Sequence, residues 1–262
     1  MKITLFTSNK NRHNYFINLL SEVAEELYVV QECETIFTGI IPGDYKASPI
    51  MSKYFENVNN VQLKLFGNSY VNSYNKNIKT LPILSGDLNE CSMGFLSDFL
   101  QSNIYIVFGS SYIKGELVDF LIKQKAINIH AGVSPYYRGA DCNFWALYDN
   151  NPHLVGATIH LLSKGLDNGP ILYHSMSNLN KNPFEYTMST VKSAFHSIVD
   201  KIKNNSIFKI EPAVQEKNKE IRYSRKNEFN EEIVKKYFEK KIDLNSSKFN
   251  DSLLKEPFFL NN

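Results

Sequence analysis

Short apolar runs that alternate with helical patterns constrain the fold of this chain more than any other feature of its sequence. The clearest runs are IYIVFGS at 104–110 and AINIHAG at 126–132, with a helical pattern at about 114–124 between them. An uninterrupted apolar strand is typical of a parallel sheet that is covered on both faces. Further strands are expected at 2–8, 26–32, 79–84, 155–163 and 170–176, and further helices at 15–23, 50–66, 92–101, 141–149 and 183–204.

This alternation predicts an α/β fold in which a twisted, mostly parallel sheet carries helices on both faces. Pro82 has no N–H to donate to a neighbouring strand, so strand 79–84 is expected at an edge of the sheet. Pro42, Gly43 and Asp44 predict a turn. Residues 1–205 are expected to form the main domain, and residues 206–262 a short C-terminal extension rather than a full barrel domain.

Charge and composition exclude several classes of partner. The formal net charge is +2, and nine Lys or Arg residues within 214–243 are interleaved with seven acidic ones, which is typical of a solvated face. Neither nucleic acid nor a membrane is therefore expected as a partner. No apolar run is long enough to cross a bilayer and the first residues lack a signal-peptide pattern, so a cytoplasmic location is expected. Cys33, Cys91 and Cys142 have no metal-ligand spacing, so neither a metal site nor a disulfide is expected.

Three polar residues stand where two predicted strands and a loop can bring them together. Asn128 and His130 are two positions apart in strand 126–132, so their side chains point to the same face. Asp167 lies in a glycine-bracketed loop between the strands at 155–163 and 170–176. Because open α/β sheets bind ligands at the carboxyl ends of their strands, we expect the three residues to meet at that edge.

An amide, an imidazole and a carboxylate suit acyl transfer to an amine without a covalent intermediate. Asn128 can donate a hydrogen bond to the oxyanion, and a protonated His130 can stabilise the same charge. The carboxylate of Asp167 is expected to raise the pKa of His130 and to relay the proton that the attacking amine loses.

These motifs, in this order, are similar to those of the folate-dependent formyltransferase family, which includes methionyl-tRNA, glycinamide ribonucleotide and nucleotide-sugar N-formyltransferases. The similar segments are Asn-x-His at 128–130, Ser-Pro-x-Tyr-Arg-Gly at 134–139 and Gly-Leu-Asp-x-Gly-x-Ile-Leu at 165–172. The resemblance is strong over 104–173, loose over 1–103 and weak beyond about 205. It implies a Rossmann-like formyltransferase fold with residues 1–205 as the catalytic domain, and Asn128, His130 and Asp167 as catalytic residues.

The same resemblance implies 10-formyltetrahydrofolate as the formyl donor. The segment 104–113 is similar to the folate-contacting strand and loop of the family. The residues expected to bind the donor are Phe108, Gly109, Ser110, Ser111, Tyr112, Ile113, Gly165 and Leu166.

The family uses several formyl acceptors, and two features of this sequence reduce the number of candidates. The first loop lacks the glycine-rich phosphate cradle of the purine enzyme, and the charge-balanced C-terminal segment is too short for the barrel and basic loop of the tRNA enzyme. A nucleotide-linked amino sugar is therefore expected. A methionyl-tRNA formyltransferase-like enzyme and a non-catalytic binding protein on the same fold are the alternatives.

Acceptor contacts are expected at Lys10, Arg12, His13, Tyr136 and Arg138. The first three precede or begin a predicted helix, whose N-terminus can bind an anion, but solvent-facing charges explain them equally well. Two further questions stay open: whether His160 is structural or lines a pocket, and whether Phe144 and Trp145 line a pocket or pack in the core. The sequence also leaves a homodimer open.

Overall fold

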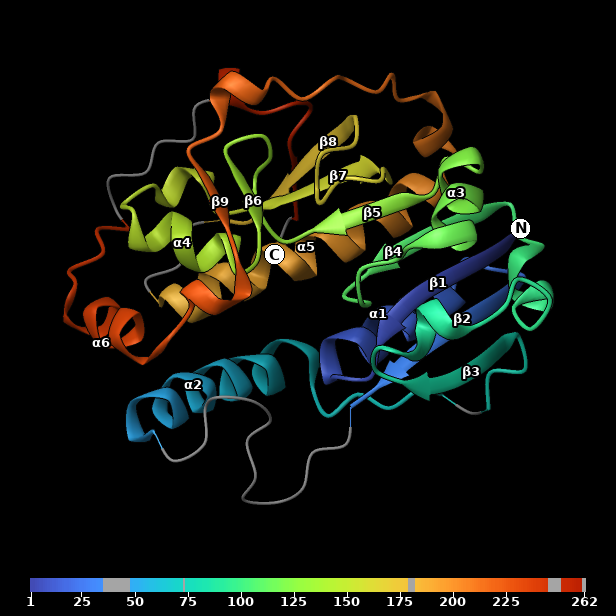
Figure 1. Cartoon of the computed structure of the whole chain (residues 1–262), viewed down its shortest axis with the longest axis horizontal. Coiled ribbons are helices and arrows are strands. Elements are labelled where there is room, and N and C mark those ends of the chain that lie inside the picture. The colour runs from blue at the N-terminus through green and yellow to red at the C-terminus, as the bar shows by residue number, and fades with distance from the viewer. Residues whose placement is uncertain (35–47, 73, 179–181, 245–250, 261–262) are drawn as a thin grey trace.

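The computed structural model describes residues 1–34, 48–72, 74–178, 182–244 and 251–260. One eight-stranded sheet runs through the described part, in the order β10-β8-β7-β5-β4-β1-β2-β3 (Figure 1). Only β7 pairs antiparallel with its neighbours, β5 and β8, so the mostly parallel α/β sheet is confirmed. The strands are β1 (Lys2–Ser8), β2 (Glu26–Cys33), β3 (Ile78–Leu84), β4 (Ile104–Phe108), β5 (Ile127–His130), β7 (Ala157–Leu161), β8 (Ile171–Met176) and β10 (Phe258–Phe259).

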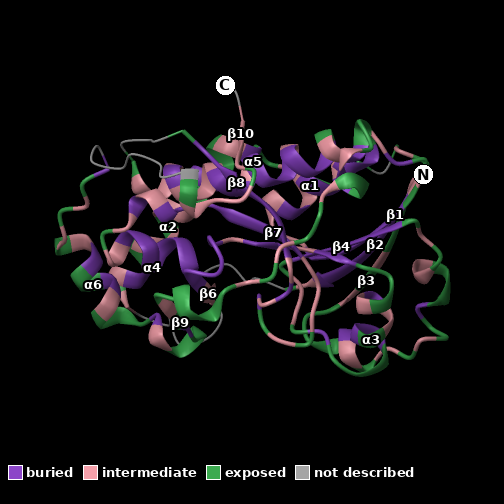
Figure 2. Ribbon diagram, turned by 90° about the horizontal axis from the view of Figure 1, so that it is seen from above, coloured by how far each residue is buried: buried purple, intermediate pink, exposed green. Residues whose placement is uncertain are grey.

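Helices cover both faces of this sheet. In Figure 2, α1 and α5 lie on one side of the strands and α3 on the other. Phe16 of α1 and Phe195 of α5 stack with ring centroids 4.3 Å apart in the larger core, and Leu117 and Leu121 of α3 lie in the core on the opposite face. The helices are α1 (Asn11–Ser21), α2 (Pro49–Phe66), α3 (Gly115–Lys123), α4 (Cys142–Tyr148), α5 (Pro183–Lys203) and α6 (Glu231–Glu239).

Most predicted elements are confirmed, including the helix at 50–66 and the edge position of β3, which contains Pro82. The helix predicted at 92–101 is wrong: only Ser97–Leu100 (η3) forms a 3-10 turn there. Gly94 disfavours a helix interior by about 1 kcal/mol relative to alanine. The predicted turn at 42–44 lies outside the described residues.

The C-terminal extension returns to the sheet instead of standing apart. Ala213 and Ile171 exchange two backbone hydrogen bonds of 2.7 and 2.8 Å. The short strand β9 (Arg222–Ser224) then pairs in parallel with β6 (Tyr137–Gly139), which lies in the loop after β5. Helix α6 packs Tyr237 against Phe144 of α4, with ring centroids 4.7 Å apart. Phe144 and Trp145 are therefore core residues.

Short 3-10 helices connect these elements. They are η2 (Asp87–Glu90), η4 (Pro152–Leu154), η5 (Ser206–Lys209), η6 (Lys217–Lys219), η7 (Lys226–Glu228) and η8 (Asp251–Leu253). Within the described residues, none of the helices is long and apolar enough to cross a membrane.

His174 makes the stability of this fold sensitive to acid. Its Nε2–H donates to the Ser134 carbonyl and its Nδ1 accepts from the Lys255 N–H, each at 2.8 Å, an arrangement that only the neutral ring satisfies. Burial lowers the pKa of His174 to about 4. The unfolded chain therefore binds this proton first, and stability falls as the pH drops below about 6.5.

We expect the free energy of unfolding to fall by about 2 kcal/mol between pH 7 and pH 5 from this histidine alone. Urea unfolding of the wild type and of His174→Gln at both pH values measures it. The variant should lose less stability over that interval, and an equal loss in both proteins would contradict the assignment.

Candidate active site

The three residues expected to be catalytic meet on a face of the sheet. Ile127 and Ile129 of β5 point into the core beneath α5, so Asn128 and His130 point to the opposite face. Because β7 is antiparallel to β5, the β7–β8 loop begins beside the start of β5, where the Leu162 N–H donates to the Ala126 carbonyl. The loop then folds back over the strands. The carboxylate of Asp167 is thus brought to Asn128 and His130 from above the sheet, not along the edge that we expected.

The contacts within this cluster are short and converge on one carboxylate. The Asp167 Oδ2 lies 3.3 Å from the His130 Nδ1 and accepts from the Gly139 N–H at 3.3 Å. Its Oδ1 accepts from the Asn128 Nδ2 at 3.3 Å and lies 3.8 Å from the His160 Nε2. Asp167 itself has a φ of +49°, a left-handed conformation that is uncommon outside glycine.

The electrostatics of the cluster favour an ionised Asp167. Burial alone would raise the pKa of its carboxyl, but His130, His160 and the Gly139 N–H together lower that pKa to about 2. Burial lowers the pKa of His130 and the negative charge of Asp167 raises it. Burial has the larger effect, so the pKa of His130 lies below the ordinary 6.5. The expected effect of Asp167 on His130 is present, but it is smaller than the effect of burial. A neutral His130 therefore faces an ionised Asp167 at neutral pH.

His130 is placed to gain a proton when negative charge develops nearby. Its Nε2 lies 3.1 Å from the Tyr137 carbonyl oxygen, while its Nδ1 faces Asp167. A neutral imidazole has one N–H and can satisfy only one of these two oxygens, whereas an imidazolium satisfies both. The geometry suits a ring that is neutral at rest and cationic in a transition state.

His160 braces the cluster. Its Nδ1 donates to the Leu161 carbonyl at 2.8 Å, its Nε2 lies 3.0 Å from the Asn128 Nδ2, and the ring is only 1% exposed. Asn128 is the cross-strand partner of His160 and directs both of its amide hydrogens at His160 and Asp167. In this geometry the amide orients these two side chains, and donation to an oxyanion requires that it first release one of them.

The two loops expected to bind the donor lie side by side. The hydroxyl of Tyr112 donates to the carbonyl of Lys164, the residue before Gly165. Tyr112 and Leu166 keep 48% and 39% of their surface exposed, so both present apolar surface to solvent beside the cluster. Gly109 has a φ of +65°, and the Ser110 hydroxyl bonds to the Ser111 carbonyl at 3.2 Å, while Phe108 and Ile113 are buried in the core.

Two polar side chains that the sequence reasoning missed, the buried Glu32 and the half-buried Asn89, hold the first of these loops. Glu32, at the end of β2, accepts from the Ser111 N–H and hydroxyl and from the Gly86 N–H, at 2.5, 2.8 and 2.9 Å. Asn89 donates to the Tyr112 carbonyl at 2.9 Å and accepts from the Lys114 N–H at 2.8 Å. An acidic residue at the carboxyl end of a predicted strand, where open α/β sheets place ligands, was the available signal for Glu32.

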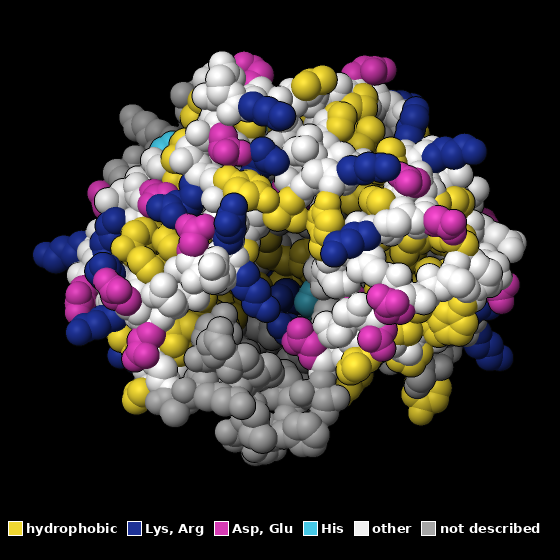
Figure 3. Space-filling view, viewed as in Figure 1, with side chains coloured by type: hydrophobic (Ala, Val, Ile, Leu, Met, Phe, Trp, Pro, Cys, Tyr) yellow, Lys and Arg dark blue, Asp and Glu magenta, His cyan; other side chains and the backbone are white. Residues whose placement is uncertain are grey.

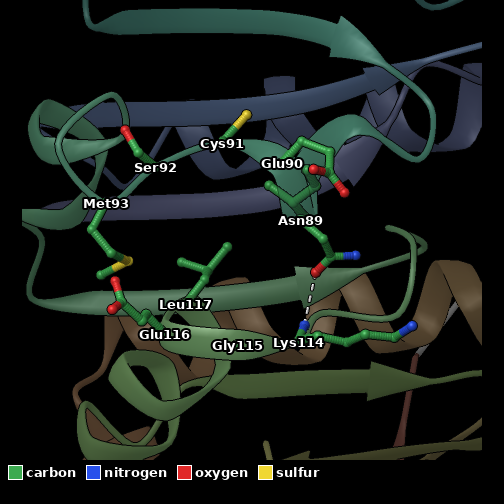
Figure 4. Close-up of a pocket in the computed structure, with 10 residues that line it drawn as sticks. Asn89, Glu90, Cys91, Ser92, Met93, Lys114, Gly115, Glu116 and Leu117 are labelled. Carbon is green, nitrogen blue, oxygen red and sulfur yellow. Dashed lines mark hydrogen bonds between the residues drawn. The ribbon is translucent and has the colours of Figure 1, made fainter.

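A pocket of about 350 Å³ adjoins the same loop, between η2 and the start of α3 (Figure 4). Its lining includes Asn89, Cys91, Met93 and Lys114. Among the described residues, none of the expected catalytic side chains lines it. A separate hollow opens in the middle of the face seen in Figure 3, where Lys or Arg side chains and a histidine are visible.

The residues expected to bind the acceptor are divided between several places. Lys10 lies 3.5 Å from Glu34, and the half-buried Arg12 donates to Gln62 of α2 at 2.9 Å. His13 is 2% exposed, packs on the Phe108 ring, and has no hydrogen-bond partner for either ring nitrogen among the described residues. The structure therefore puts His13 beneath the expected donor loop.

The other two belong to the loop after β5. Tyr136 is buried in a core cluster. Arg138 donates to Glu220 at 2.8 Å and to the Leu166 carbonyl at 2.9 Å, and its guanidinium lies over the Tyr223 ring. Arg138 thus ties the loop after β5 to the Asp167 loop.

Gly132 is a further residue that the sequence reasoning missed. A Cβ at this position would lie 2.5 Å from the His130 Nε2 and 2.5 Å from the Cys142 Cβ. The glycine leaves room for the imidazole in its present orientation. In the described part of the chain, no group of three or more His, Cys, Asp or Glu side chains could hold a metal ion.

Comparisons with known proteins find similarity in sequence and in fold. Residues 103–202 match the formyl transferase family. A methionyl-tRNA formyltransferase of Thermodesulfovibrio yellowstonii is 39% identical over 67 residues, which are 26% of this chain and 21% of that protein. One of Thermotoga neapolitana is 38% identical over 91 residues, 34% of this chain and 28% of that protein. The matched segments thus span less than a third of these relatives.

Solved structures share the fold over most of the chain. A sugar N-formyltransferase from Shewanella sp FDAARGOS_354 superposes with a TM-score of 0.53 at 14% identity, covering 87% of this chain and 78% of that one. An N-formyltransferase from Helicobacter canadensis, in complex with folinic acid and dTDP-3-aminofucose, superposes with a TM-score of 0.52 at 14% identity, covering 88% and 73%. Residues 103–202 of this chain thus match the formyl transferase family in sequence, and the chain shares its fold with these solved formyltransferases.

Proposed function

We propose that this chain transfers a formyl group from 10-formyltetrahydrofolate to the amino group of a nucleotide-linked amino sugar. The observation that carries the proposal is the convergence of Asn128, His130 and Gly139 on the carboxylate of Asp167. Oriented polar groups in a buried site stabilise a developing oxyanion with little reorganisation. Burial of His130 and Asp167 meets that requirement.

In the proposed reaction the acceptor amine attacks the formyl carbon. The new N–C bond forms, the amine loses a proton, the bond from the formyl carbon to N10 of the folate breaks, and N10 takes up a proton. Asp167 accepts the proton that the amine loses and passes it to His130, which carries the positive charge while the oxyanion exists. The pair then gives up a proton to N10 as the bond to the folate breaks. One proton is lost and one is gained, so the site itself is unchanged after each turnover.

The donor is proposed to lie between the Ser110–Ile113 loop and the Asp167 loop. Tyr112 and Leu166 offer exposed apolar surface for an aromatic ring, and Glu32 and Asn89 hold the first loop in place. The contact between the Tyr112 hydroxyl and the Lys164 carbonyl bridges these loops and would open to admit the donor.

A nucleotide-linked amino sugar is the proposed acceptor because the N-formyltransferase from Helicobacter canadensis, which shares this fold, was solved in complex with dTDP-3-aminofucose. The low net charge also supports it, since tRNA binding rests on many cationic contacts to phosphates. Methionyl-tRNA is the second candidate, because the curated relatives matched in sequence are methionyl-tRNA formyltransferases.

An acceptor competition decides between these candidates. We expect purified protein with 10-formyltetrahydrofolate to add the mass of one carbon monoxide unit to an amino-sugar nucleotide, and to leave methionyl-tRNA and glycinamide ribonucleotide unlabelled in the same tube. If only methionyl-tRNA or glycinamide ribonucleotide were labelled, the proposed acceptor would be wrong, but the proposed formyltransferase activity would stand. Absence of label in every acceptor would overturn the enzymatic proposal.

A further inference from the structure

The segment after α5 reaches the catalytic cluster although it lies outside the family-matched residues 103–202. The Gln215 Nε2 donates to the Asp167 carbonyl at 2.9 Å and to the Gly169 carbonyl at 2.7 Å. The Oε1 of the same amide is buried and has no partner among the described residues. Because carbonyl oxygens only accept, the amide has one productive orientation, with its nitrogen toward the Asp167 loop.

These two hydrogen bonds hold the loop in the shape that aims the carboxylate. Asp167 has a φ of +49°, and such conformations persist only where the surroundings impose them. Gln215 joins the backbone on both sides of Asn168, next to that unusual residue. Without it, the loop has fewer contacts that favour the left-handed conformation.

The same segment holds the other side of the cluster through β9. The Tyr136 carbonyl accepts from the Ile221 and Arg222 N–H groups at 2.9 and 3.0 Å, and the Ala140 N–H donates to the Ser224 carbonyl at 3.0 Å. These bonds fasten β6 at both ends. Strand β6 in turn presents the Tyr137 carbonyl to His130 and the Gly139 N–H to Asp167.

We propose that residues 213–225, the C-terminal strap, set the geometry of the His130–Asp167 pair, and that Gln215 is the positioning residue of the Asp167 loop. The inference deepens the proposed function and rests on it for its kinetic test. Gln215 acts through the Asp167 backbone and is not a catalytic residue. Glu220 adds to the same strap by holding Arg138, which bonds to the Leu166 carbonyl.

Gln215→Leu removes both hydrogen bonds at a partly exposed position, and Gln215→Glu keeps the shape of the side chain. We expect kcat of Gln215→Leu to fall about 10²-fold, with KM for the acceptor unchanged, because a displacement of about 1 Å has such an effect. The carboxylate in Gln215→Glu faces two carbonyl oxygens until it is protonated. Its kcat relative to the wild type should therefore rise as the pH is lowered from 8 to 6.

The matched control is Glu216→Gln, which alters the neighbouring exposed residue that pairs with Lys219 and leaves the cluster untouched. It should keep wild-type kcat and KM. Circular dichroism melts test whether each variant is folded. If Gln215→Leu does not fold, the pH dependence of Gln215→Glu decides the question. Wild-type kcat in both folded variants, or equal losses in the control, would overturn the proposal.

A measurement without turnover separates this inference from the proposed function. NMR titration of His130, assigned with a His130→Gln variant, should give a lower pKa in Gln215→Leu than in the wild type, because a displaced Asp167 supports the imidazolium less. The value in Glu216→Gln should match the wild type. If no acceptor is formylated, the proposed function fails, and this titration still decides whether the strap positions the pair. An unchanged His130 pKa in Gln215→Leu would overturn it.

Discussion

Replacing Asp167 with asparagine is expected to lower the rate of formyl transfer by about 10²–10⁴-fold, and His130→Ala to have an effect of similar size. Asparagine keeps the shape of the side chain but removes the charge that supports an imidazolium at His130 and accepts the amine proton. Because the two side chains lie 3.3 Å apart and act on one charge, the double variant should lose little more than either single one.

Single-turnover assays with saturating donor and acceptor measure the chemical step directly. Asp98→Asn, at an exposed position of η3, serves as the control and should retain the wild-type rate. If Asp167→Asn or His130→Ala retained most of the wild-type rate with the natural acceptor, the catalytic assignment would be wrong. Retention of the fold in both variants is checked by circular dichroism.

Gly139→Ala is expected to destabilise the fold by about 2–4 kcal/mol and to abolish most activity. Gly139 has a φ of +94°, and a Cβ there would lie 2.1 Å from the Ser224 carbonyl oxygen. The obstacle is the backbone of β9, which cannot rotate away as a side chain could. Since the Gly139 N–H also donates to Asp167, any movement of β6 disturbs the carboxylate.

Gly86→Ala separates the effect of a positive φ from the effect of the close contact with β9. Gly86 has a φ of +100°, close to that of Gly139, but no atom lies within 4 Å of its hypothetical Cβ. Its substitution should show the backbone strain alone, about 1–2 kcal/mol in urea unfolding, with little change in the catalytic rate. Equal destabilisation by both variants would contradict the close approach of β6 and β9.

Much of the fold follows from local sequence. Continuous apolar runs such as IYIVFGS need cover on two faces, and helical spacing in the 183–204 segment supplies an apolar stripe that can provide it. Pro82 predicted an edge position for β3 because proline has no N–H to donate to a neighbouring strand, whatever surrounds it. The shared face of Asn128 and His130 likewise follows from the two-residue period of a strand.

Tertiary structure alone decided how the rest of the site is assembled. Strands of two or three residues, β6, β9 and β10, are too short to have a period, and they exist because distant segments pair with them. The antiparallel direction of β7 depends on how the chain turns after α4, and it brings Asp167 over the face of the sheet. Gln215 is an ordinary polar residue in a charged segment until the strap lays its amide against two carbonyl groups.

The positions of Lys10, Arg12 and His13 illustrate the same limit. Local sequence predicted three basic groups at a helix N-terminus, which the structure confirms as the start of α1. Whether such groups face a ligand depends on what packs against the helix: Gln62 of α2 accepts from Arg12, and Gly109 covers His13. Periodicity and backbone chemistry act between near neighbours and can be read from the chain, whereas these contacts join residues far apart in sequence and exist only once the chain has folded.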